Sequence, residues 1–157
     1  MGLSLDFSKL KPHDVIDLAI FAEQEAQDNY EQLATILRSR HNDHAADFFQ
    51  RMAGFEKLHH DQLVTRRNQF FPNVVPSLAD RWFWGIEAPD YAAVGQTITV
   101  RAAYEFALES EVRAHDYYAG ALNFVSDMVV TDLFEHLRAA EADHQRLLRE
   151  ELAKLPA

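Results

Sequence analysis

Apolar residues recur every three or four positions along four long segments of this chain, which is the spacing of one face of an α-helix. The five glycines and five prolines lie mostly between these segments, where such residues interrupt helices. The predicted helices run from Pro12 to about Arg40, from Asn42 or Asp43 to about Phe70, from about Thr97 to Val125, and from Ser126 or Asp127 to about Lys154. The pattern therefore predicts an all-α protein.

The lengths of the connections predict how these helices are arranged. Short turns after the first and third helices make each pair an antiparallel hairpin, whereas residues 71 to 96 are long enough to run along a bundle. We expect an antiparallel four-helix bundle of two hairpins joined by this crossover, forming a single domain over residues 1–157. The aromatic run Trp82, Phe83 and Trp84 in the crossover is expected to plug the bundle or, alternatively, to contact a second copy.

Each predicted helix carries ionisable residues in the middle of its apolar stripe. In the second helix, for example, a glutamate and a histidine lie between Met52 and Leu63 at core spacing. When the four stripes face one another, four glutamates and two histidines meet at one level of the core: Glu23, Glu56, His59, Glu111, Glu141 and His144.

The two halves of the chain repeat this arrangement. "AIFAEQEAQDNYEQLA" from Ala19 aligns with "ALESEVRAHDYYAGAL" from Ala107, and each segment has a glutamate followed seven positions later by a tyrosine. "FEKLHHDQL" from Phe55 aligns with "AEADHQRLL" from Ala140, and each contains Glu-x-x-His. One such motif is weak evidence, but two copies on core stripes indicate a shared site.

The negative charge of the buried glutamates limits which ligands this site can hold. Buried carboxylates without a partner cost several kcal/mol each, and no lysine or arginine lies on the stripes near these acids. Two divalent cations would balance four carboxylates. Because the chain has no cysteine, the ligands must be nitrogen and oxygen, which suits iron or manganese.

The net charge and the absence of certain sequence motifs argue against several classes of function. A formal net charge of -10 argues against binding to nucleic acid or to an anionic membrane. The sequence shows neither a targeting signal nor a long apolar run, so a cytoplasmic location is expected. Glycine-rich phosphate loops and nucleophile elbows are absent as well.

Through "AIFAEQEAQDNY", "MAGFEKLHHDQL", "ALESEVRAHDYY" and "LRAAEADHQRLL" the chain resembles the ferritin-like superfamily, and within it the rubrerythrin-like proteins, from about Pro12 to Lys154. The resemblance implies a carboxylate-bridged centre of two iron ions, with manganese as the alternative, that reacts with hydrogen peroxide or oxygen. It also implies a homodimer. The implied ligands are bridging Glu56 and Glu141, terminal Glu23 and Glu111, and one histidine per metal, His59 and His144.

Three further residues have more than one interpretation each. Tyr30 and Tyr118 are expected either to donate hydrogen bonds to carboxylates across the bundle or simply to fill the core. His115 lies on the stripe of Glu111, where it would be an extra or exchanging ligand, a hydrogen-bond partner within the cavity or a satisfied interior histidine. In the expected mechanism, Tyr30, Tyr118 or His115 relays protons. The remaining histidines lie off the stripes or near helix ends and are assigned no role.

The sequence departs from the rubrerythrin pattern in two ways. Those proteins carry a cysteine-bound iron site that supplies electrons, so this cysteine-free chain would need a separate electron donor protein. They also have an extra glutamate three residues after the terminal ligand of the third helix, where this chain has Ala114. The function expected is reduction of peroxide or oxygen; the alternatives are ferroxidase or iron storage, a metal-binding scaffold without turnover, and hydroxylation of an organic substrate.

Overall fold

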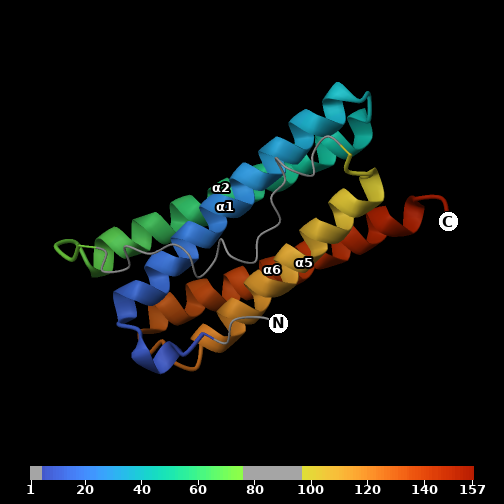
Figure 1. Ribbon diagram of the computed structural model, residues 1–157. Coiled ribbons are helices and arrows are strands. Elements are labelled where there is room, and N and C mark those ends of the chain that lie inside the picture. Colours follow the sequence, from blue (N-terminus) through green and yellow to red (C-terminus); the bar gives the residue numbers. More distant parts are fainter. Residues whose placement is uncertain (1–4, 76–96) are drawn as a thin grey trace.

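The computed structural model describes residues 5–75 and 97–157, and within them four α-helices form an antiparallel bundle (Figure 1). Helices α1 and α2 form one hairpin and α5 and α6 form the other, while α1 also packs on α5 and α2 on α6. This confirms the predicted fold class. The elements are η1 (Phe7–Lys9), α1 (Pro12–Ser39), α2 (Asp43–Phe70), α5 (Val100–Ala121) and α6 (Met128–Lys154).

Local chemistry sets the helix ends close to where the sequence predicts them. Pro12 occupies the first turn of α1, where a residue without an N–H is tolerated. His41 adopts a positive φ of 60°, and the N–H of Asn42 donates to the carbonyl of Leu37 at 2.9 Å, which closes α1 before α2 begins. At α6 the carboxylate of Asp127 accepts hydrogen bonds from the N–H groups of the first turn, as a helix cap does.

The third helix is shorter than predicted. It was expected from Thr97 to Val125, but α5 begins at Val100 because the hydroxyl of Thr99 accepts a hydrogen bond from the N–H of Ala102 and caps it there. Its far end tightens after Ala121, where the N–H of Phe124 donates three residues back to the carbonyl of Ala121. Such bonds replace the regular ladder at helix ends.

Most of the predicted crossover, and with it Trp82, Phe83 and Trp84, lies outside the described residues. Of the part that is described, residues 71–75 are tied to the hairpin by Arg67. Its guanidinium binds the carboxylate of Asp17 with two hydrogen bonds of 2.6 and 3.1 Å, and it donates to the carbonyls of Phe71 and Val74. None of the helices in this part of the chain combines the length and the apolar character that crossing a membrane requires.

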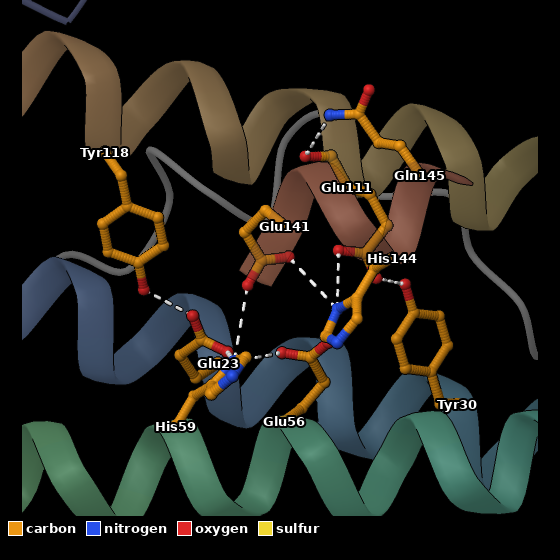
Figure 2. A network of polar contacts seen from close by, with 9 residues as sticks. All are labelled: Glu23, Tyr30, Glu56, His59, Glu111, Tyr118, Glu141, His144 and Gln145. Carbon is orange, nitrogen blue, oxygen red and sulfur yellow. Dashed lines mark hydrogen bonds and ion pairs between the residues drawn. The ribbon is translucent and has the colours of Figure 1, made fainter. Parts of the chain in front are cut away.

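The core divides into two apolar clusters, one toward each end of the bundle. One cluster gathers around Tyr30, Phe49 and Tyr104, and the other around Tyr118 and Phe134. The six ionisable residues singled out by the sequence are also buried, and they lie between Tyr30 and Tyr118 (Figure 2). The fold therefore places a polar layer between two apolar layers.

Candidate metal centre

Each helix of the bundle contributes to one buried group of carboxylates and imidazoles (Figure 2). On α2 and α6, glutamate and histidine three residues apart lie on the same helix face, and both faces are turned toward the interior. None of the six side chains belongs to a residue more than 5% exposed. The structure thus brings together every ligand that the sequence predicts: Glu23 from α1, Glu56 and His59 from α2, Glu111 from α5, and Glu141 and His144 from α6.

The six residues form two overlapping sets of possible metal ligands. One set is Glu23, Glu56, His59 and Glu141; the other is Glu56, Glu111, Glu141 and His144, and within each set the ligand atoms lie within 4.8 Å of one another. Glu56 and Glu141 belong to both sets, whereas each remaining residue belongs to one. This is the arrangement that two ions bridged by two carboxylates would need.

The histidines face these carboxylates through the same ring nitrogen. Nδ1 of His59 lies 3.4 Å from an oxygen of each glutamate in its set. Nδ1 of His144 lies 3.1 to 3.6 Å from the three glutamates of the other set. The donor atoms therefore converge on two neighbouring points, one for each imidazole.

Several of these donor atoms are buried without a hydrogen bond of ordinary geometry. They are Oε2 of Glu23, Oε1 of Glu56 and of Glu141, and Nδ1 of His59 and of His144. Buried polar atoms are normally satisfied, so a cluster of unsatisfied atoms aimed at the same two points needs an explanation. Bound metal ions supply one, and a nitrogen and oxygen donor set suits iron or manganese.

Without a metal, the close contacts shift the acidities of the centre. Burial, with the neighbouring carboxylates, raises the pKa of Glu23 and Glu141 well above the usual range. Burial also acts to raise the pKa of Glu56, but hydrogen bonding to Glu23 and to the two histidines lowers it overall.

The histidines shift in the opposite sense to ordinary buried histidines. Burial acts to lower the pKa of His59, but the glutamates around its ring raise it to about 12. The pKa of His144 is raised for the same reason. In its metal-free form the centre therefore retains protons that metal ions would displace.

Two tyrosines extend the centre along the bundle axis. The hydroxyl of Tyr30, on α1, donates to Glu111 on α5, and the hydroxyl of Tyr118, on α5, donates to Glu23 on α1 (Figure 2). Of the two sequence-based interpretations, the structure shows the hydrogen-bonded one, since both phenols are buried and bound to predicted ligands. Burial also raises the pKa of Tyr118 well above its usual range, so this phenol retains its proton.

The side chain of His115 is more exposed than the sequence predicts. Its side chain is 33% exposed, and Nδ1 lies 3.3 Å from the carboxylate of Asp116. Neither ligand set among the described residues includes it. The expectation of an interior histidine is therefore wrong, because His115 lies at the edge of the stripe that Glu111 and Tyr118 share.

Two residues that the sequence analysis did not single out contact the ligand histidines. The ring of Phe55 stacks on His144, and the ring of His136 meets His59 edge-on. His136 was assigned no role because it lies off the core stripe of α6. The only sequence signal for Phe55 is its place immediately before Glu56, where the repeat has Ala140 before Glu141.

Comparison with known proteins is consistent with this geometry. The sequence profile of the rubrerythrin family matches residues 14–152. Among solved structures, an uncharacterised conserved protein from Magnetospirillum magnetotacticum MS-1 has a TM-score of 0.80 at 26% identity, covering 94% of this chain and 97% of that chain. A hypothetical protein from Pyrococcus furiosus shares the fold, with a TM-score of 0.68 at 20% identity and coverage of 94% and 92%. No curated protein matches the chain significantly.

Proposed function

Because this chain belongs to the rubrerythrin family, we propose that it is a di-metal oxidoreductase that reduces hydrogen peroxide or, as the second choice, oxygen to water. The observation that carries the proposal is the pair of ligand sets that share Glu56 and Glu141. Iron is the proposed metal and manganese the alternative, because both accept mixed carboxylate and imidazole ligands.

When bound, two redox-active ions would supply electrons and Lewis acidity for cleaving an oxygen–oxygen bond. Reduction of one peroxide molecule to two water molecules consumes two electrons and two protons. The cysteine-free chain has no thiolate-bound iron site of its own, so we propose that a separate electron donor protein restores the reduced centre.

The protein side chains would hold the ligands in place and supply protons. Tyr30 and Tyr118 each keep a proton on a buried hydroxyl and orient one carboxylate through it, Glu111 and Glu23 respectively. Fixing ligand carboxylates in this way keeps the centre preorganised. Delivery of protons through Tyr30, Tyr118 or His115 stays a prediction, and direct contact with ligand carboxylates favours the two tyrosines.

The first test is the metal content of protein purified without chelators, measured again after anaerobic loading with ferrous iron. We expect two ions per chain, and oxidation of the loaded centre by one equivalent of peroxide. Glu56→Ala should abolish paired binding and peroxide turnover, since Glu56 belongs to both ligand sets. The matched control is Glu109→Ala, which removes an exposed acid from α5 and should change neither.

The outcomes separate the candidate functions. A Glu56→Ala protein that keeps two ions and turns over peroxide normally would refute the assignment. Accumulation of many irons per chain in air would instead indicate iron storage, and two tightly held ions that peroxide never oxidises would indicate a scaffold. The cytoplasmic location and the homodimer stay predictions.

A further inference from the structure

The two halves of the centre match in their ligands but differ in what packs against each ligand histidine. The repeat aligns Glu56 with Glu141 and the two histidines with each other, yet it aligns Phe55 with Ala140. A phenyl ring and a methyl group differ greatly in the surface they can cover. The two halves of the centre therefore carry the same charged ligands but differ in the side chain at the position before the shared glutamate, Phe55 or Ala140.

Two aromatic rings stack on the imidazole of His144. The ring of Phe55 does so with 5.4 Å between ring centroids and an interplanar angle of 24°. The ring of His59 does so at 5.6 Å and 18°. These two stacked neighbours restrict rotation of the His144 imidazole.

Among the described residues, one ring, that of His144, stacks on the imidazole of His59. The other aromatic neighbour found there, His136, meets it edge-on at 6.5 Å and 84° and is itself an exposed residue. His59 and His144 are equally buried, at 5% exposure each. The difference between the halves is therefore one of ring restraint and not of access to water.

Stacking replaces the usual means of orienting a ligand histidine. Such histidines normally donate their second ring nitrogen to a carboxylate or a carbonyl, and this bond fixes the ring. In the described part of the chain, no hydrogen bond to Nε2 of His144 is found, and Nδ1 faces the carboxylates. Phe55 remains 43% exposed, so it lies at the rim of the core while its ring covers the imidazole of His144.

We infer that Phe55 is a positioning residue that fixes His144 in its metal-binding orientation, so that the His144 half of the centre binds its ion more tightly than the His59 half. The inference rests on the proposed metal centre and deepens it. It predicts two ions that are inequivalent in affinity although their ligand sets have the same composition.

The test is an anaerobic titration of the metal-free chain with cobalt(II), followed by absorption spectroscopy, and repeated with ferrous iron. The wild type should bind two ions in distinguishable steps. Phe55→Ala should weaken the tighter step about tenfold, as expected for loss of an aromatic contact that orients a ligand, and leave the weaker step unchanged. Phe55→Tyr should restore the wild-type result, because the added hydroxyl can point to solvent.

Two further sets of variants separate positioning from general packing. Leu58→Ala removes a more exposed apolar side chain from the same helix, with 55% exposure, and should affect neither step. In a His59→Ala background, which retains the His144 ligand set, Phe55→Ala should weaken the remaining ion about tenfold. In a His144→Ala background the same change should have no effect.

The outcomes distinguish failure of the inference from failure of the centre. Three results would overturn the inference and leave the centre intact. The wild type could bind two ions with equal affinity, Phe55→Ala could weaken both binding steps, or Phe55→Ala could weaken binding equally in the two histidine backgrounds. A wild-type chain that binds no ion would overturn both. Thermal unfolding of the metal-free variants checks that each of them folds.

Discussion

The metal-free protein should become less stable as the pH rises from 7.5 to 8.5. In the folded state the pKa of His59 is raised to about 12 from an ordinary value of 6.5, and that of His144 is raised as well. Between the unfolded-state and folded-state pKa values of these histidines, the folded chain binds protons that the unfolded chain has released. Stability falls with pH wherever the folded state binds more protons, so the direction is fixed by the sign of these two shifts.

The magnitude follows from the number of protons. One proton held only by the folded state changes the free energy of unfolding by about 1.36 kcal/mol per pH unit. Two histidines together give at most about 2.7 kcal/mol over this unit of pH. The raised pKa values of Glu23 and Glu141 act in the same direction. Glu56, whose pKa is lowered, is ionised in both states at this pH and adds no slope.

Bound metal should remove this dependence, because the ions take the place of the protons on the ring nitrogens and carboxylates. The assay is chemical denaturation at pH 6.5, 7.5 and 8.5, with a chelator and again with manganous ion in excess. His144→Asn should lower the metal-free slope by about 1.36 kcal/mol per pH unit, which is the share of one histidine. The control His115→Asn, at a partly exposed histidine outside both ligand sets, should keep it. A metal-free protein whose stability is constant or rises over this range would show that the imidazoles do not hold their protons.

Three other changes test separate parts of the structure. Glu141→Ala should remove both ions, whereas Glu23→Ala should remove only one, because Glu141 belongs to both ligand sets and Glu23 to one; elemental analysis that finds equal losses would contradict the bridging role. Tyr30→Phe deprives Glu111 of its hydroxyl donor and should weaken binding of one ion about tenfold or more. A metal titration in which Tyr30→Phe binds both ions with unchanged affinity would contradict this role of Tyr30. Arg67→Ala should lower the free energy of unfolding by about 3 kcal/mol, since it breaks a largely buried ion pair, while the metal content stays normal; a loss below about 1 kcal/mol in chemical denaturation would contradict the role of this residue as a tie.

The buried cluster of six candidate ligands could be predicted from the sequence because burial and helical periodicity are linked within one helix. Glu56 and His59 occupy positions that would otherwise carry apolar side chains between Met52 and Leu63, and the second half of the chain repeats the pattern. The two glutamates and two histidines of the repeated motif, Glu56, His59, Glu141 and His144, are all buried. Helix ends were predicted to within a few residues because capping is also local. At α5 the start was misplaced because Thr99 was overlooked as a cap, and the end was misplaced because the helix tightens after Ala121.

Contacts between helices could not be predicted in the same way. His115 follows Glu111 by four residues, but an ideal helix drifts relative to such a stripe, and rotation of α5 decides whether the position faces the core. Arg67 is fifty positions from Asp17, to which it binds. The stacking of Phe55 on His144 likewise depends on how α2 and α6 lie against each other. Spacing along one helix contains no information on any of these contacts.

The placement of the centre explains how a bundle of this size can accommodate so much buried charge. Carboxylates and imidazoles removed from water cost free energy that only partners can offset, and without metal the partners here are protons shared within one polar layer. Apolar clusters around Tyr104 on one side and Phe134 on the other stabilise the four helices independently of that layer. The metal-free chain can therefore fold with protons as the partners of its donor atoms, and ions that bind to the folded chain stabilise it by their own binding free energy.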